Sequence, residues 1–246
     1  MPTIKIMKDI SDSFVIKKDG LDSVSFRSII CGKSGVGKTN IIGSLLCLKE
    51  NYSDLFLGKH IFIFSPLKND FKMESIIKFK SIPKENVFTE YNDDILNNIY
   101  DEIVDDFESQ IENKKIPNNY LILLDDVSFD GSLKKGNYNA INRCFMNIRK
   151  HCGSILISSQ KYSQISTGQR SNASSVFFFN SNMKERELFE ADNNYIGSRK
   201  AFFAMLEDNL KNKRDFIYVN YSVDTVDKMY RNSKFELIDI NKYKLK

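Results

Sequence analysis

Residues 32–39 read Gly32-Lys33-Ser34-Gly35-Val36-Gly37-Lys38-Thr39, and this stretch decides how the rest of the chain folds. It fits the pattern G-x-x-x-x-G-K-[ST] at every position, which is the signature of a phosphate-binding loop. Glycines let the backbone curl so that its N–H groups point at phosphate oxygens. Lys38 can reach the β- and γ-phosphates of a nucleotide, and the Thr39 hydroxyl can hold Mg²⁺. The sequence therefore predicts a nucleotide site formed by all eight residues.

The segments on either side of this loop have the patterns that a phosphate-binding loop requires. The apolar residues 28–31 predict a strand that leads into it, and apolar residues at helical spacing predict a helix over about 38–50 that leads out. Short apolar runs then alternate with helical patterns along the chain. Strands are expected at 60–65, 120–124, 154–158, 176–179 and 216–221, and further helices at 140–150, 185–193 and 199–210. This alternation indicates an α/β sandwich with a largely parallel sheet.

A single domain is expected to contain all 246 residues. Its parts are an N-terminal extension over 1–24, where Asp19-Gly20 predicts the turn of a β-hairpin, a core over 25–180, and C-terminal helices and a strand over 181–246. No apolar run approaches the roughly 18 residues that would span a membrane, and the N-terminus lacks the hydrophobic block of a secretory signal. The 4 cysteines show no C-x-x-C spacing and the 2 histidines form no cluster, which disfavours disulfides and a zinc site.

Charge is unevenly distributed, although the formal net charge is only +4. Residues 85–112 contain ten acidic and no basic side chains, and their apolar residues predict an amphipathic helix with an acidic solvent face. Residues 131–170 contain seven basic and no acidic side chains, and the loop at 128–139 is rich in Gly, Lys and Asn. Such a loop suits contact with a DNA phosphate backbone, with Lys134 and Lys135 as candidates, although an ordinary surface loop has the same composition.

Polar side chains follow two of the predicted strands, at the end where each strand would meet the phosphate loop. The run LILLDD (121–126) ends in Asp125 and Asp126, and SILISSQ (154–160) ends in Gln160. A buried strand that ends in Asp at this position would place the carboxylate beside the bound phosphates. Asp125 is then expected to act on the Mg²⁺ side, and Asp126 to orient or deprotonate the attacking water. Gln160 could contact the γ-phosphate or that water. The alternative is that these are ordinary polar turns after buried strands.

Hydrolysis also needs positive charge against the transferring phosphoryl group, beyond Lys38 and Mg²⁺. Arg170 lies in a loop rich in Ser, Thr, Gly and Gln, ten residues after Gln160, while Arg143 and Arg149 lie on or after the preceding helix. Any of the three could act as an arginine finger that reaches a neighbouring subunit. Each could equally be a surface arginine or a contact to DNA.

These features resemble, in their order along the chain, the additional-strand class of P-loop ATPases, which have a three-layer α/β sandwich around a mostly parallel sheet. More narrowly, the chain is similar to the genome-packaging ATPases of poxvirus-like large DNA viruses, virophages and polinton-like elements, within the FtsK–HerA superfamily. The resemblance spans residues 32–235. It is carried by GKSGVGKT (32–39), IFIFSPLKND (61–70), LILLDDV (121–127), IRKHCGSILISSQ (148–160), Arg170-Ser171-Asn172 and MYRNSKF (229–235).

The resemblance implies an enzyme that hydrolyses ATP with Mg²⁺ in a homo-oligomeric ring and moves double-stranded DNA into a preformed capsid. The implied partners are DNA, further copies of the chain and a capsid or portal-vertex protein, with no membrane insertion. The implied location is the cytoplasm of an infected host cell, in a viral factory or with the virion, and not outside the cell. By position, the implied roles are phosphate and Mg²⁺ binding for Lys38 and Thr39, metal binding for Asp125, catalysis for Asp126, sensing for Gln160, and the arginine finger for Arg170 or Arg149.

Three alternatives share the same phosphate loop. A DNA helicase or transposition ATPase of the AAA+ type would carry a helical lid after the core, whereas here a strand is predicted at 216–221. A small nucleotide kinase would act on a phosphate acceptor, which the Asp125-Asp126 pair and Gln160 disfavour. The presence of Lys38, Thr39, Asp125 and Asp126 argues against a non-hydrolysing, nucleotide-dependent scaffold.

Overall fold

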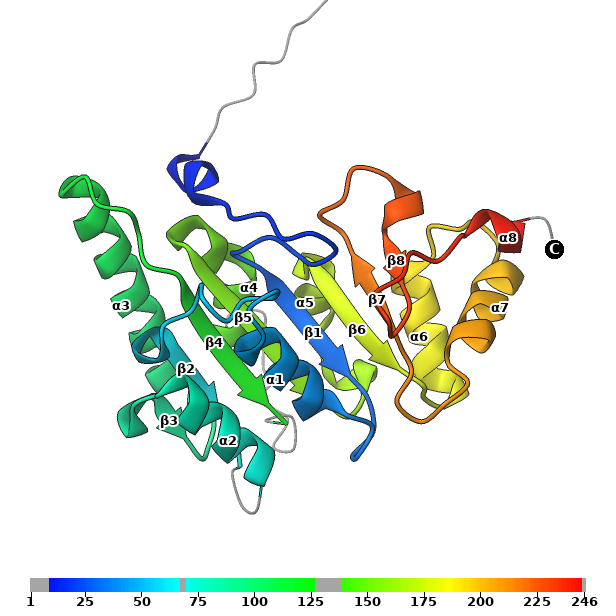
Figure 1. The fold of residues 1–246 in the computed structure, drawn as a ribbon, viewed down its shortest axis with the longest axis horizontal. Helices are drawn as coiled ribbons and strands as arrows, with labels where there is room; N and C mark the ends of the chain where they lie inside the picture. The colour runs from blue at the N-terminus through cyan, green and yellow to red at the C-terminus, as the bar shows by residue number, and fades with distance from the viewer. Residues whose placement is uncertain (1–8, 67–69, 127–138, 245–246) are drawn as a thin grey trace, which may run out of the picture.

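The computed structural model describes residues 9–66, 70–126 and 139–244, and its strands form one sheet. The strand order is β3-β2-β4-β5-β1-β6-β7-β8, with every pairing parallel from β3 to β6 and antiparallel from β6 to β8. The fold is therefore the predicted α/β class with a mostly parallel sheet (Figure 1). The strands are β1 Arg27–Cys31, β2 Ile61–Phe64, β3 Val87–Phe88, β4 Tyr120–Asp125, β5 Gly153–Ser159, β6 Ser175–Phe179, β7 Phe216–Asn220 and β8 Tyr230–Arg231.

Helices cover both faces of this sheet. The α-helices are α1 Lys38–Cys47, α2 Phe71–Lys80, α3 Asp93–Glu112, α4 Ala140–Asn147, α5 Thr167–Asn172, α6 Met183–Asn193, α7 Arg199–Asn209 and α8 Asn241–Lys244. In β4, Leu121 and Leu123 pack with α1 and α2, whereas Ile122 and Leu124 pack with α3 and α4. This alternation divides the core into two layers, and α1 and α2 lie in front of the sheet in Figure 1.

The acidic stretch forms the long helix α3, as its pattern predicts. The side chain of Asn92 caps the helix by accepting hydrogen bonds from the backbone N–H groups of Asp94 and Ile95, at 2.8 and 3.1 Å. Acidic residues in the first turn favour this end because they face the positive end of the helix dipole. One stripe of the helix is buried against the sheet, and it consists of Leu96, Ile99, Tyr100, Ile103 and Phe107.

Two local predictions differ from the structure. The expected N-terminal β-hairpin is reduced to one antiparallel bridge between Ile16 and Val24, because the chain before it forms a 3₁₀ turn over Ile10–Phe14 capped by Asp9. The helix expected over 140–150 ends at Asn147, and a 3₁₀ turn over Ile148–His151 follows. Residue 152 then takes a left-handed conformation with φ of 56°, which redirects the chain into β5. No helix among the described residues is long and apolar enough to cross a membrane.

Candidate nucleotide site

The phosphate loop, the acidic pair and Gln160 meet at the edge of the sheet where three parallel strands end. Asp125, the last residue of β4, is in register with Ser158 of β5. The backbone N–H of Asp126 donates to the carbonyl of Ser158 at 3.1 Å, and that of Gly32 donates to the carbonyl of Ser159 at 3.0 Å. Gln160 follows Ser159 directly, so the structure brings these sequence-predicted residues together.

The backbone conformation and close packing of the loop require glycine at several positions. Gly35 and Gly37 have φ of 74° and 118°, in the left-handed region where a side chain would be strained. A Cβ on Gly32 would lie 2.8 Å from both Cβ of Phe179 and Cγ2 of Val36, so close packing also requires glycine there. Helix α1 begins at Lys38, and its first N–H groups face the loop. The arrangement is a helix N-terminus prepared for a phosphate group.

Lys38 is held inside the site by two oxygens. Its side chain is only 7% exposed, and its Nζ donates to the carbonyl of Gly32 at 3.0 Å. The same ammonium lies 3.5 Å from Oδ1 of Asp126. Asp126 has φ of 49°, a left-handed conformation that is rare for a residue other than glycine and that directs its carboxylate toward the loop. Lys38 and Asp126 therefore flank the space beside the loop, one from the start of α1 and the other from the end of β4.

Asp125 lies deeper than Asp126. It is 6% exposed, and the Ser65 hydroxyl at the end of β2 donates to its Oδ2 at 3.2 Å. Burial raises the pKa of Asp125, and the charge of Asp126 acts in the same direction, whereas the Ser65 hydroxyl and the charge of Lys38 oppose them. A bound cation would offset the free-energy cost of burying this carboxylate in its charged form. Thr39 and Asp125 line the same pocket, and these two oxygen donors suit Mg²⁺, which takes its other ligands from phosphates and water.

Several other side chains in the phosphate pocket were not predicted from the sequence. Asp70 caps α2 by accepting from the N–H groups of Lys72 and Met73, each at 3.0 Å. Lys72 donates through Nζ to Oδ1 of Asn40 at 2.7 Å, so α2 contributes a cation beside the start of α1. The described pocket lining is Ser34, Gly35, Gly37, Lys38, Thr39, Asn40, Asp70, Lys72, Asp125, Asp126 and Arg214.

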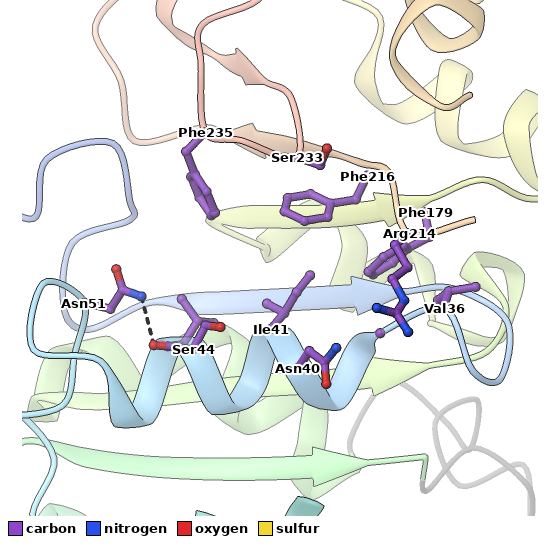
Figure 2. Close-up of a pocket in the computed structure, with 12 residues that line it drawn as sticks. Val36, Asn40, Ile41, Ser44, Asn51, Phe179, Arg214, Phe216, Ser233 and Phe235 are labelled. Atoms are coloured by element: carbon purple, nitrogen blue, oxygen red, sulfur yellow. Dashed lines mark hydrogen bonds between the residues drawn. The ribbon is translucent and has the colours of Figure 1, made fainter. Parts of the chain in front are cut away.

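A second cavity of ≈ 220 Å³ adjoins the phosphate pocket on the side of the C-terminal strands. Figure 2 shows the rings of Phe216 and Phe235 above α1, with Ile41 facing them from the helix. Phe216 and Phe235 pack edge to face with their ring centroids 5.9 Å apart. An apolar cavity with aromatic walls and a few polar groups at its margin suits a planar heterocyclic base. No local pattern in the sequence indicates this cavity, because its walls lie far apart in the chain.

The arginines that sequence reasoning offered as fingers do not line the phosphate pocket of their own subunit. Arg170 lies on α5 and not in the expected loop, where its Nε is 2.6 Å from Oδ2 of Asp192 and its guanidinium lies over the ring of Tyr162. Arg149 lines a polar cavity at the opposite edge of the sheet, together with Arg27. Arg143 pairs with Asp101 at 2.7 Å, and Lys134 and Lys135 lie outside the described residues.

A family model described as "Poxvirus A32 protein" matches residues 14–238. Among solved structures, the genome packaging NTPase B204 from Sulfolobus turreted icosahedral virus 2 in complex with AMP has a TM-score of 0.56 at 13% identity, covering 85% of this chain and 96% of that chain. B204, the DNA-packaging ATPase from Sulfolobus Turreted Icosahedral Virus, has a TM-score of 0.55 at 14% identity, covering 85% and 97%.

The cytoplasmic domain of the Thermomonospora curvata Type VII secretion ATPase EccC has a TM-score of 0.50 at 11% identity, covering 85% of this chain and 25% of that chain. No curated protein matches the chain significantly. At these identities the likeness to solved structures is one of fold.

Proposed function

The chain belongs to the poxvirus A32 protein family, and from that premise we propose that it is an ATPase that drives viral DNA into a capsid. The observation that carries the proposal is the meeting of the phosphate loop, the acidic pair and Gln160 at one edge of the sheet. In the proposed site, the N-terminus of α1 binds phosphate and a carboxylate beside it acts on water. The fold that the chain shares with the B204 NTPases agrees with it.

In the proposed reaction, each group of the site acts on one part of ATP. The loop N–H groups and Lys38 bind the β- and γ-phosphates, while Asp126 orients and deprotonates the attacking water. Gln160 contacts that water or the γ-phosphate without changing its own charge. Thr39 and Asp125 would hold Mg²⁺, which neutralises charge on the phosphate oxygens when bound. An arginine from a neighbouring subunit of a homo-oligomeric ring, Arg170 or Arg149, would supply the remaining positive charge.

The coupling of hydrolysis to DNA is proposed to run through Asp126. The segment 127–138, which carries Lys134 and Lys135, follows this residue directly in the chain. A shift of Asp126 during hydrolysis would move lysines that contact the phosphate backbone of double-stranded DNA, and such contacts need no sequence preference. Replacing both lysines by alanine is expected to remove DNA stimulation of hydrolysis while leaving basal hydrolysis intact, and a variant that keeps full stimulation would exclude this route.

A capsid or portal-vertex protein is the proposed docking partner. This part of the proposal rests on family membership, since a packaging motor must be anchored where the DNA enters. The corresponding place of action is the viral factory of an infected cell.

Steady-state ATP hydrolysis with and without double-stranded DNA tests the proposal. The purified chain is assayed at low and moderate salt beside Asp126→Asn, with Asp224→Asn, at an exposed position away from the site, as the matched control. DNA is expected to stimulate wild type and control, to lose this effect as salt rises, and to have no effect on Asp126→Asn. Hydrolysis that ignores DNA at concentrations that allow ring assembly would contradict the proposal.

A further inference from the structure

We propose that Arg214 is a nucleotide-positioning residue that binds the α-phosphate from within the same subunit. The inference rests on the proposed function, because it concerns the same nucleotide. Arg214 belongs to segment 210–215, which connects the end of α7 to the start of β7. Sequence reasoning assigned this part of the chain to peripheral helices and a strand, with no role in the site.

The position of Arg214 carries the proposal. Three residues line both the phosphate pocket and the aromatic cavity, and they are Gly37, Asn40 and Arg214. Figure 2 shows the Arg214 side chain extending from the segment before β7 toward the N-terminal end of α1, between Val36 and Asn40. Arg214 therefore lies at the junction of the two cavities.

Arg214 has no direct ion-pair partner among the described residues, although Asp70, Asp125 and Asp126 line the same phosphate pocket. The carboxylate of the neighbouring Asp215 accepts hydrogen bonds from the backbone N–H and the side-chain amide of Asn212, at 2.7 and 3.0 Å. Arg214 itself is exposed and makes no hydrogen bond or ion pair through its side chain with any residue in the described ranges. Lys213 adds charge nearby, because its Nζ lies 3.6 Å from the position that a Cβ on Gly35 would occupy. The turn that contains Asn212 and Asp215 thus presents two cations to the loop, and neither is in an ion pair with a described residue.

The order of base, ribose and phosphates in a nucleotide indicates that the α-phosphate is the group nearest to Arg214. Lys38 and Thr39 place the β- and γ-phosphates in the inner pocket, and the aromatic walls of Phe216 and Phe235 place the base in the other cavity. The part of the nucleotide that crosses the junction consists of the ribose and the α-phosphate. Of these two, only the α-phosphate is an anion that a guanidinium binds with paired hydrogen bonds.

Because ATP and ADP both carry an α-phosphate, Arg214 is expected to bind them equally. It would hold the nucleotide through hydrolysis without taking part in the chemical step. Loss of the guanidinium should then weaken both nucleotides by the same factor, about tenfold for one charge-assisted contact. The Michaelis constant for ATP should rise by that factor while kcat changes little, which is the behaviour of a group that binds ground state and transition state alike.

The test measures the dissociation constants of ATP, ADP and AMP by calorimetry in an Asp126→Asn background, in which hydrolysis is expected to be slow. Arg214→Ala is compared with Arg214→Lys, which keeps the positive charge but not the paired N–H groups of the guanidinium. Arg214→Lys should therefore lose less nucleotide affinity than Arg214→Ala. Arg199→Ala is the matched control and should bind as the parent does, because Arg199 begins α7, is 60% exposed and pairs with Glu187 of α6. Unfolding by urea should be unchanged in Arg214→Ala, because the side chain has no hydrogen bond or ion pair among the described residues to lose.

An equal loss for ATP, ADP and AMP supports the proposal. A loss for ATP alone would assign Arg214 to the γ-phosphate, and a loss for ATP and ADP but not for AMP would assign it to the β-phosphate; either result would overturn the proposal. Parental affinity in Arg214→Ala, with binding abolished in Lys38→Ala, would overturn this inference and leave the proposed function standing. A wild-type chain that binds no ATP would overturn both this inference and the proposed function.

Discussion

The ammonium of Lys38 lies 3.5 Å from Oδ1 of Asp126 and 3.0 Å from the carbonyl oxygen of Gly32, so the loop lysine and the candidate catalytic carboxylate are direct partners. The two side chains come from α1 and from the end of β4, and both face the space where phosphates are expected. A γ-phosphate that binds Lys38 must compete with Asp126 for the same ammonium. We therefore propose that nucleotide binding and release of the carboxylate toward water are linked at this one contact.

This contact predicts opposite effects of Asp126→Asn on binding and hydrolysis. ATP affinity should be equal to or higher than that of wild type, because the amide no longer competes for Lys38 and no longer repels phosphate. Hydrolysis should fall by at least about 10², since the general base is gone. Calorimetry with ATP and a phosphate-release assay measure the two quantities on the same preparation. A variant that binds ATP much more weakly would mean that Asp126 holds the nucleotide and not the water.

Stability should depend on pH through Asp22, which is 2% exposed at the opposite edge of the sheet. The Ser222 hydroxyl donates to its Oδ1 at 2.7 Å, yet burial raises its pKa above the ordinary value of 3.8. The folded state thus holds this proton more tightly than the unfolded state does. The free energy of unfolding should fall as pH rises from about 4 through the raised pKa.

Urea unfolding between about pH 4 and pH 8 measures this dependence. Asp22→Asn should flatten it and should be at least as stable as wild type at neutral pH, because the amide carries no charge to bury. Asp224→Asn changes an exposed carboxylate and should keep the wild-type profile. A wild-type profile that rises over this interval would show that other carboxylates dominate the pH dependence.

Packing around Gly58 gives a prediction about folding alone. A Cβ at this position would lie 2.0 Å from the backbone carbonyl oxygen of Lys80, which no side-chain rotation can relieve. Gly58→Ala should lower the free energy of unfolding by about 1–3 kcal/mol, the usual range for overpacking. Gly168→Ala is the control, since its nearest neighbour would be Ser166 Oγ at 3.9 Å and alanine favours the helix α5. Equal stability of the two variants in urea would mean that the backbone at Lys80 moves aside without cost.

The parts of the site that the sequence predicted are those that local rules determine. The phosphate loop and the residues that end β4 and β5 follow from short patterns, because parallel strands present their carboxyl ends at one edge. Arg214, Phe216 and Phe235 could not be found in this way. Arg214 and Phe216 reach the loop because β7 pairs antiparallel with β6, which returns a distant segment to the same edge. Phe235 packs against Phe216 because it follows β8, which pairs antiparallel with β7. Long-range pairing of this kind leaves no local pattern.

One departure could have been predicted. Arg170 was expected in a loop, but Ser166 and Gln169 form a capping box in which each side chain accepts a hydrogen bond from the backbone N–H of the other. The S-x-x-Q pattern at 166–169 is a known signal for the start of a helix. Helix α5 then carries Arg170 against Asp192 and Tyr162, away from the nucleotide site of its own subunit.

Arg170 can be tested as an arginine finger that acts on the nucleotide site of a neighbouring subunit. If it serves a neighbour's site, Arg170→Ala should retain ATP binding but lose about 10³ or more in kcat, the usual contribution of an arginine finger. Asp126→Asn is inactive for a different reason, since it keeps the arginine and lacks the base. Mixing the two inactive variants under conditions that allow subunit exchange should restore hydrolysis, because some interfaces then combine an intact Asp126 with an intact Arg170.

The same mixture with Arg149→Ala in place of Arg170→Ala separates the two candidate fingers, and only the true finger should show recovery with Asp126→Asn. Arg199→Ala, which breaks an exposed pair with Glu187, should be active without mixing and serves as the control for loss of an arginine. Urea unfolding accompanies each variant, because the 2.6 Å contact between Arg170 and Asp192 gives Arg170 a structural role as well. Failure of both mixtures to recover, with folded subunits that exchange, would mean that neither arginine acts in trans.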